Sequence, residues 1–266
     1  MTRSARVLAF LSCLVLAPLV TSAAPVATAA EPTFPMDARV TLDACRTAVE
    51  ARIEGALTAT RALAATEQVR SGDWGRMRGP LEVMAGGVKE NAAVWFARPD
   101  GSYFSVEKGL IGESLRDRAY FPDLLAGRDV VGSLVISKST GQRSVIVASP
   151  VLVDGKVAGV VGVSLDAAKL AASLEQAIRF PADVIFYALD RQGRTALHRA
   201  SELIFVFPSD VGSPTLGDAV KTMLSKPEGV VEYQYAGSDR TVVFERSGLT
   251  GWVFVLGKSH PPAVKP

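Results

Sequence analysis

The chain has 266 residues, of which 48% are hydrophobic, and it carries 29 basic and 27 acidic side chains. This apolar fraction is ample for a globular core, and the length fits one large or two small domains. Residues 1–30 hold two arginines and no acid, so the remaining chain has 27 charges of each sign. A balanced chain lacks the basic surface that binds nucleic acid, so we expect no nucleic-acid partner.

Residues 1–29 have the order of features found in a secretory signal peptide. Arg3 and Arg6 come first, an apolar run follows over residues 7–20, and Ala27-Thr28-Ala29 forms an A-x-A cleavage sequence. The apolar run is short for a membrane span. We therefore expect a periplasmic or secreted protein. The alternative is an uncleaved segment that anchors the protein to the outer face of the inner membrane.

The two cysteines lie in different parts of the chain. Cys13 belongs to the signal segment, and Phe10-Leu11-Ser12 before it match a lipoprotein signal poorly. Cys45 is then alone, so no intramolecular disulfide can form. Because Cys45 lies on an apolar helical stripe, we expect a buried free thiol, with an intermolecular bridge as the alternative.

A long helix is predicted over residues 36–69, within the N-terminal segment 30–73. Pro35 and Asp37 suit a first helical turn, and Ser71-Gly72-Asp73 ends the pattern. The apolar stripe at helical spacing comprises Leu42, Cys45, Val49, Ile53, Leu57, Thr60 and Leu63. Such a helix would be about 50 Å long, which exceeds the diameter of one small domain, so we expect it to span two stacked units.

Residues 74–166 are predicted to form a first module of strands. Pro99-Asp100-Gly101 between two apolar runs is a turn, and Asp154-Gly155 is a strong hairpin signal. The polar segment 109–129 is expected to contain a short helix near residues 120–126. The predicted strands cover residues 92–97, 102–106, 132–137, 143–153 and 156–165.

Residues 180–258 repeat this plan in a second module, and residues 259–266 are expected to be a flexible tail. Residues 167–179 carry apolar side chains at i, i+4 and i+8, which predicts a helix that links the modules. A second helix is expected over residues 216–224. The predicted strands cover residues 183–189, 194–198, 229–235, 240–246 and 251–257.

No enzyme motif stands out in the sequence. Residues 251–259 resemble a phosphate-binding loop, but five residues separate its glycines where the motif needs four. The histidines His198 and His260 belong to no cluster that predicts a metal site or a catalytic centre. We therefore expect no catalytic residues, no cofactor and no bound metal, and an exported hydrolase finds no support.

Three segments of the first module carry a resemblance to a known family. They are Arg118-Ala119-Tyr120-Phe121, the strand end Ile136-Ser137-Lys138-Ser139-Thr140-Gly141, and the hairpin over residues 149–163. Together with the long helix before them, they resemble the Cache family in its double-Cache layout, over residues 36–258. The match in the second module is looser and rests on strand order and on the closing strand Thr250–Leu256.

The resemblance implies an α+β fold: a long N-terminal helix with two stacked PAS-like modules that have antiparallel sheets. It also implies extracytoplasmic recognition of a small molecule, commonly in the first, membrane-distal module. Such pockets draw on the R-x-Y-F segment and the later strands. The resemblance therefore implies that the ligand is contacted by Arg118, Tyr120, Ser137 and Lys138. The arginine fork suits a carboxylate, tyrosine offers an apolar face and a hydroxyl, and serine and lysine add donors.

Ser164 distinguishes this chain from amino-acid-binding members of the family. Those members carry an acid on the strand after the hairpin to receive the ammonium group of the ligand, and Ser164 is about where that acid would be. Asp166 shares its strand face but lies near the strand end. The expected ligand is therefore a carboxylate without an amine. The alternative for Arg118 is a surface ion pair with Asp117 or Asp123.

The expected function is a sensor that binds a small, carboxylate-bearing metabolite. No output region follows residue 258, so we expect signalling through a separate partner, such as a membrane sensor kinase or a transporter. A second copy of the chain, paired through the long helix, is a further partner considered. The alternative is a ligandless protein-interaction module that acts through that helix.

Overall fold

The structure, a computed structural model, describes residues 37–261, so the predicted signal segment lies outside the described residues. The first element is helix α1 (Ala38–Ala64), and the side chain of Asp37 caps it by accepting a hydrogen bond from the Arg39 amide at 2.7 Å. The predicted apolar stripe is buried, and Cys45 is a fully buried free thiol, as expected.

The helix ends earlier than predicted. Thr66 has an extended backbone (ψ 148°), and its hydroxyl accepts a hydrogen bond from the Val69 amide, so it starts a separate short helix, α2 (Glu67–Arg70). The prediction of one helix over residues 36–69 is therefore wrong at its C-terminal end, because a local N-cap interrupts the periodic pattern.

A third helix, α3 (Trp74–Gly87), was not predicted. It contains four glycines and Pro80, a composition that disfavours a helix. Tertiary packing supports it, because Met77, Leu81 and Met84 are buried in the same core as α1.

The first module is a six-stranded antiparallel sheet in the order β3-β2-β1-β6-β5-β4. Helix α4 (Phe121–Leu125) confirms the short helix predicted near residues 120–126. An edge strand, β3, forms where no strand was expected. It was not predicted because its exposed residues lack apolar alternation. The strands are β1 (Asn91–Ala97), β2 (Ser102–Ser105), β3 (Gly109–Ser114), β4 (Val130–Ile136), β5 (Arg143–Val153) and β6 (Lys156–Asp166).

Helix α5 (Ala167–Ile178) leads into the second module, a five-stranded antiparallel sheet in the order β8-β7-β11-β10-β9. The two separate sheets and the linking helix confirm the predicted repeat of one plan. The strands are β7 (Val184–Leu189), β8 (Thr195–His198), β9 (Glu228–Tyr235), β10 (Ser238–Arg246) and β11 (Val253–His260). Between β8 and β9 lie the 3-10 turn η1 (Ser201–Leu203) and the helices α6 (Pro208–Val211) and α7 (Pro214–Ser225).

The last strand extends further than predicted. Ser259 and His260 pair with Arg240 and Asp239 of β10, so the flexible tail expected over residues 259–266 is wrong at its start. The sequence shows only a polar chain end there, whereas the neighbouring strand supplies the backbone pairing.

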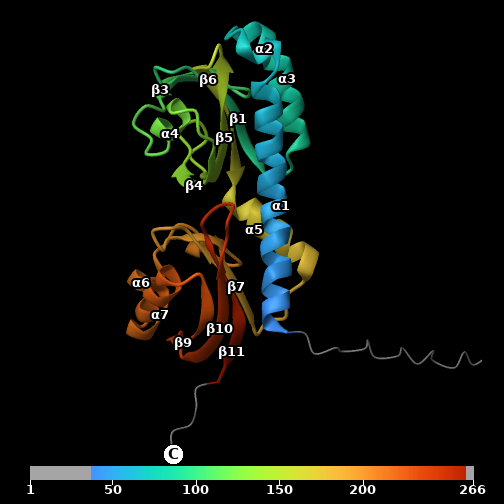
Figure 1. The fold of residues 1–266 in the computed structure, drawn as a ribbon. Coiled ribbons are helices and arrows are strands. Elements are labelled where there is room, and N and C mark those ends of the chain that lie inside the picture. Colours follow the sequence, from blue (N-terminus) through green and yellow to red (C-terminus); the bar gives the residue numbers. More distant parts are fainter. Residues whose placement is uncertain (1–36, 262–266) are drawn as a thin grey trace, which may run out of the picture. The chain divides into compact units, whose positions relative to one another are not determined.

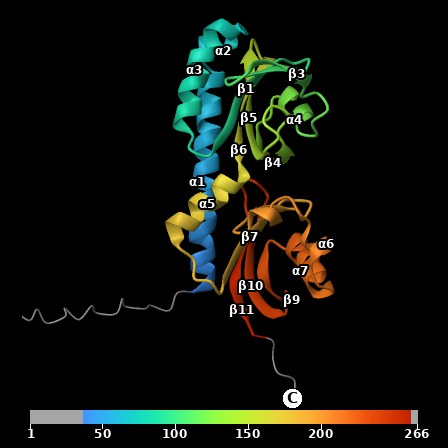
Figure 2. The same cartoon turned by 180° about the vertical axis from the view of Figure 1, so that it is seen from behind.

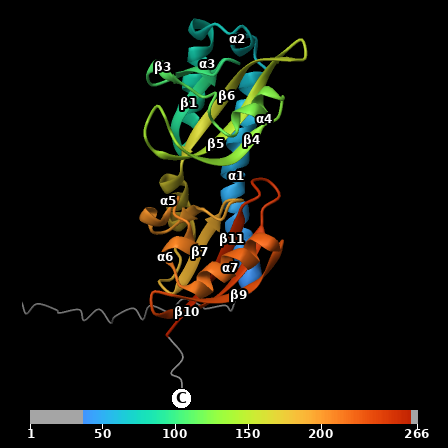
Figure 3. The ribbon, with the colours of Figure 1, turned by 90° about the vertical axis from the view of Figure 1, so that its left-hand side faces the viewer.

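Helix α1 lies along one face of both sheets (Figures 1 and 2). One apolar core forms there, with Phe96 of β1 and Phe186 of β7 among its members. The adjacent residues Trp95 and Tyr187 belong instead to two separate cores, with α4 and α7 respectively. This alternation is the period-two pattern of a strand. Each module therefore has an interior of its own, between its sheet and its small helices (Figure 3).

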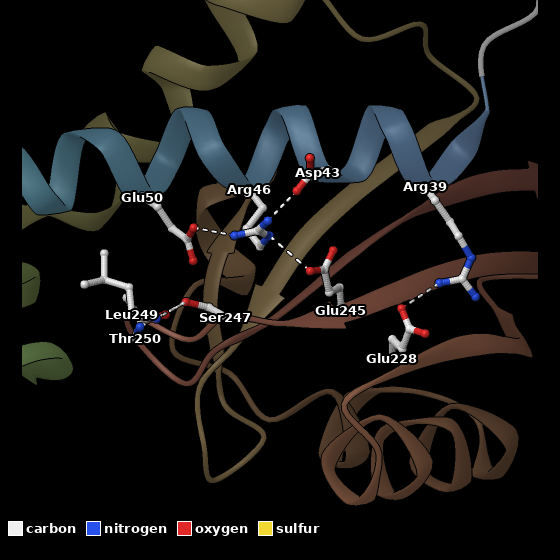
Figure 4. Close-up of polar contacts among 9 residues, drawn as sticks. All are labelled: Arg39, Asp43, Arg46, Glu50, Glu228, Glu245, Ser247, Leu249 and Thr250. Carbon is white, nitrogen blue, oxygen red and sulfur yellow. Dashed lines mark hydrogen bonds and ion pairs between the residues drawn. The ribbon is translucent and has the colours of Figure 1, made fainter.

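Polar contacts attach α1 to both modules. At 27 residues the helix is about 40 Å long, long enough to reach both sheets. Its second half contacts the first sheet through a hydrogen bond of 2.9 Å between the hydroxyls of Thr60 and Ser149. Its first half contacts the second sheet through ion pairs (Figure 4), which are Arg39–Glu228 (3.2 Å) and Arg46–Glu245 (3.5 Å).

Candidate functional site

The first module encloses a small cavity of about 20 Å³ between its sheet and the segment that leads into α4. The five residues nominated from the sequence all line it: Arg118, Tyr120, Ser137, Lys138 and Ser164. The folding of distant strands and one loop onto each other thus brings these side chains to one place. That they bind a ligand there remains a prediction.

Arg118 has one nitrogen engaged and one buried without a partner. Its Nη2 donates to the carbonyl oxygen of Ile136 at 2.7 Å, whereas its Nε is buried and makes no hydrogen bond. The carboxylates expected as alternative partners are engaged elsewhere, Asp117 with Lys138 and Asp123 with Arg128. The surface ion pair considered for Arg118 is therefore wrong.

Lys138 is already paired within the protein. Its Nζ lies 2.7 and 2.9 Å from the two carboxylate oxygens of Asp117 and donates to the carbonyl oxygen of Ser114 at 2.6 Å. The hydrogen bond from Lys138 lowers the pKa of the Asp117 carboxyl, so the pair stays charged. A ligand carboxylate would have to compete with Asp117 for this lysine.

Neutral groups complete the lining of the cavity. Burial raises the pKa of the Tyr120 hydroxyl, and burial followed by the nearby Glu113 raises that of Tyr103, so both hydroxyls keep their protons and can donate. Ser137 is buried, with its hydroxyl 3.2 Å from that of Ser139. The cavity therefore offers two cationic side chains, Arg118 and the Asp117-paired Lys138, together with several neutral donors.

Ser164 lies on β6, where its hydroxyl accepts a hydrogen bond from the Trp95 indole at 3.2 Å. Asp166, the other candidate considered for that strand, accepts hydrogen bonds from the amides of Ala168 and Lys169 and thereby caps α5. Asp166 does not line the cavity. No carboxylate side chain is among the residues that line this small cavity.

Two aromatic lining residues, Trp95 and Tyr103, were not nominated from the sequence. Both lie on the β1–β2 hairpin and face the same interior as Tyr120. The signal that could have found them is the period-two alternation of β1, in which Trp95 and Ala97 share one face and Val94 and Phe96 the other.

A larger cleft of about 760 Å³ adjoins the cavity. Arg118, Tyr120 and Val135 line both spaces. The second module contributes Arg194 and Trp252 to the cleft. Arg118 therefore lies at the boundary between the small cavity and the cleft.

Solved structures share this architecture. The ligand-binding domain of the Pseudomonas aeruginosa amino acid chemoreceptor PctB, in complex with L-Arg, matches with a TM-score of 0.68 and 18% identity, over 84% of this chain and 94% of that chain. The corresponding domain of PctC from the same organism, in complex with GABA, matches with a TM-score of 0.61 and 22% identity, over 83% and 96%. The sensory domain of the Campylobacter jejuni chemoreceptor Tlp3, with isoleucine bound, matches with a TM-score of 0.62 and 14% identity, over 84% and 91%. At these identities the likeness establishes the fold.

Two antiparallel sheets on one long helix, each with an interior of its own, define a double PAS-like fold. A family model for the Cache domain matches residues 37–266, and the chain belongs to that family. No curated protein matches the sequence at a significant level. Within residues 37–261, no helix is both long and apolar enough to cross a membrane.

Proposed function

We propose that this chain is an exported sensor whose first module binds a small metabolite bearing a carboxylate group. The observation that carries the proposal is the Nε of Arg118, which is buried without a partner beside a cavity whose other free donors are neutral. A buried unpaired donor costs about 1–3 kcal/mol, so an anionic acceptor at this position would stabilise the site. The ligands named for PctB, PctC and Tlp3 also contain a carboxylate.

The ligand proposed here has no amine. An ammonium group needs a carboxylate or several acceptors when it leaves water, and the lining of the small cavity includes no acid. At the position of Ser164, the hydroxyl is already an acceptor for Trp95. This favours a carboxylic acid over an amino acid.

Binding requires the cavity to open, because a volume of about 20 Å³ holds about one water molecule. Arg118 is the side chain that would open it. In exchanging the carbonyl oxygen of Ile136 for a ligand carboxylate, Arg118 replaces a neutral acceptor with a charged one, which is the stronger interaction. The adjoining cleft is the route of entry.

The bound state would be reported to a separate protein. Arg194 of the second module donates to the carbonyl oxygen of Leu134, two residues from the oxygen that Arg118 would release. Ligand capture therefore changes the strand that the second module contacts. We propose a membrane sensor kinase or a transporter as this partner, and we propose that the two proteins meet outside the cytoplasm. We also infer that the chain binds its ligand without catalysing a reaction.

A ligandless interaction module is the second candidate. The observation in its favour is the small size of the cavity, together with the engagement of Lys138 by Asp117. In that case the long helix would carry the interaction and the first module would be a filled core.

A thermal-shift screen of the full chain against small carboxylates, each matched with its neutral amide, separates these two functions. A ligand that binds the native state raises the midpoint of unfolding by mass action. Calorimetry with the best ligand then compares Arg118→Ala and Arg118→Lys with the control Arg116→Ala, an exposed arginine that lines neither cavity.

We expect Arg118→Ala to lose about 2–5 kcal/mol of binding free energy. Arg118→Lys should bind poorly as well, because an ammonium group cannot reproduce the planar fork. Arg116→Ala should bind like the unmodified chain. The absence of any stabilising carboxylate, or full affinity in Arg118→Ala, would reject the first-module site and favour the ligandless alternative.

A further inference from the structure

The second module contains a cavity of its own, in the interior between its sheet and the helices α6 and α7. Its volume is about 40 Å³. Its polar lining includes His198 on β8 and Arg240 on β10, and aliphatic side chains such as Val211 and Leu216 form the opposite wall. No acidic side chain is among the residues that line it.

Arg240 brings a cation with unused hydrogen-bonding capacity to this cavity. Its guanidinium lies 4.4 Å from the centre of the Tyr235 ring, which holds the group in place. Its Nε is buried and makes no hydrogen bond. An unpaired buried donor on a cation favours an acceptor, and above all an anionic one.

His198 supplies a second donor. Its Nδ1 accepts a hydrogen bond from the Ala200 amide at 2.9 Å, so the neutral ring carries its proton on Nε2. Burial, followed by the neighbouring positive charge of Arg240, lowers the pKa of His198, which keeps the ring neutral at neutral pH. The ring stacks on Tyr187, with 6.2 Å between the ring centres. The cavity therefore presents a cationic and a neutral N–H donor.

The chain between the lining residues Leu203 and Val206 is held in an unusual conformation. Phe205, which packs against the core shared with α1, has a φ of +72°, a region that bulky side chains rarely occupy. It is fixed there by a hydrogen bond from its amide to the carbonyl oxygen of Thr195 at 2.8 Å, and by the Arg194 guanidinium 4.9 Å from its ring. Backbone conformations of this kind persist where the surroundings enforce them, frequently at ligand sites.

From this cavity we infer a second ligand site, in the second module, for a short-chain monocarboxylate of the size of acetate or propionate. A volume of 40 Å³ is about three times what one buried water needs, which matches a ligand with few heavy atoms. The carboxylate would meet Arg240 and His198, and the methyl or ethyl group would lie against Val211 and Leu216. This site is independent of the one proposed for Arg118.

Calorimetric titration of the full chain with acetate, propionate and butyrate, and with acetamide and propionamide as neutral controls, tests the inference. For ligands of this size we expect dissociation constants between about 0.05 and 5 mM. Butyrate should bind more weakly than propionate because of the small volume, and the amides should not bind detectably.

Four variants locate the binding. Arg240→Met should weaken acetate binding at least about tenfold, since the cation is lost. His198→Phe keeps the ring and removes the donor, so it should weaken binding several-fold, whereas His198→Gln retains a donor and should restore part of the affinity. Lys221→Met is the control, because it removes an exposed cation on α7 that does not line the cavity. Near-ultraviolet circular dichroism checks that each variant is folded.

The outcome separates this site from that of the first module. Binding that persists in Arg118→Ala and is lost in Arg240→Met supports the inference. Binding that is lost in Arg118→Ala and kept in Arg240→Met overturns it and assigns the carboxylate to the first module instead. The absence of binding up to about 50 mM, about ten times the upper end of the expected range of dissociation constants, also overturns it, whatever the first module binds.

Discussion

Trp252 of the second module donates its indole N–H to the carbonyl oxygen of Gly132 in the first, at a distance of 3.0 Å. β4 is the edge strand of its sheet, so its outward carbonyl groups have no strand partner. Three side chains take that place: Trp252 on Gly132 (3.0 Å), Arg194 on Leu134 (3.1 Å) and Arg118 on Ile136 (2.7 Å). An edge covered in this way is protected from pairing with another chain.

Gly132 is the position where this contact is most sensitive to substitution. It has a φ of +83°, and a Cβ atom there would lie 3.0 Å from Thr250 and 3.1 Å from the Trp252 indole nitrogen. We expect Gly132→Ala to lower the free energy of unfolding more than Gly127→Ala, by about 1–3 kcal/mol, because of the added overpacking. Gly127 also has a positive φ, +78°, but has open space around it. Gly127→Ala therefore measures the cost of placing a side chain at a positive φ without any overpacking. Equal losses in urea unfolding would show that the packing of β4 on Trp252 contributes nothing.

Arg46 should matter more to stability than Arg39, although both pair with glutamates of the second sheet (Figure 4). The Arg46 and Glu50 side chains are only 20% and 14% exposed, whereas those of Arg39 and Glu228 are 49% and 61% exposed. Arg46→Met leaves Glu50 buried without its partner, which should cost about 1–3 kcal/mol. Arg39→Met should cost less than about 1 kcal/mol. Urea unfolding measures both, and a larger loss in Arg39→Met would contradict the argument.

Cys45 should be inert in the folded protein. Burial raises the pKa of its thiol to about 11 from the usual 9.0, so the reactive thiolate is scarce at neutral pH. In a Cys13→Ser background, we expect iodoacetamide to label Cys45 only after unfolding. Because the thiol pKa is higher in the folded than in the unfolded chain, burial of the neutral thiol stabilises the fold fully below pH 9.0. This stabilisation is lost as the pH rises toward about 11. Cys45→Ala should remove that loss, and rapid labelling of the native chain would contradict the buried position.

His198 should make the protein less stable in mild acid. Burial and then the charge of Arg240 lower its pKa, so protons bind the unfolded chain first as the pH falls below 6.5. The free energy of unfolding should therefore decrease from pH 6.5 downward, until the folded state is protonated too. Glu202 and Arg199 also act on this ring, with opposite signs. Urea unfolding between pH 7.5 and 5 should give a shallower slope for His198→Gln, whereas an unchanged slope would rule out this histidine as the cause.

Ser164→Asp tests the preference of the first module for a ligand without an amine. Ser164 is 3% exposed, so a carboxylate there would repel a ligand carboxylate strongly and could receive an ammonium group. We expect at least about tenfold weaker binding of the best carboxylate, equal to about 1.4 kcal/mol, and a gain of affinity for the matching amino acid. Ser164→Asn, of the same size and without charge, separates the effect of charge from that of volume. Calorimetry in which both variants behave alike would exclude an electrostatic effect at this position.

Most strand positions along the chain, the hairpin turns and the course of the long helix could be predicted from the sequence because their signals are local. Asp154-Gly155 joins β5 and β6 as expected, and the apolar spacing through Cys45 matches the buried face of α1. The end of α1 at Ala64 and the helix α3 were not predicted. There, a cap and tertiary packing outweigh the periodicity and the helix propensity.

The sequence by itself determined which residue types are available for a site: an arginine, a tyrosine, two serines and a lysine in segments typical of the Cache family. Only the tertiary structure decided which of these side chains are paired and which keep an unused donor. Lys138 is paired with Asp117, whereas Arg118 donates a hydrogen bond to the carbonyl oxygen of Ile136 and has a buried N–H without an acceptor. The cavity around Arg240 likewise depends on strands and helices that meet only after folding. The physical reason is that periodicity and turn chemistry depend on neighbours in sequence, whereas the partner of a charge and the volume of a cavity depend on residues brought together from distant parts of the chain.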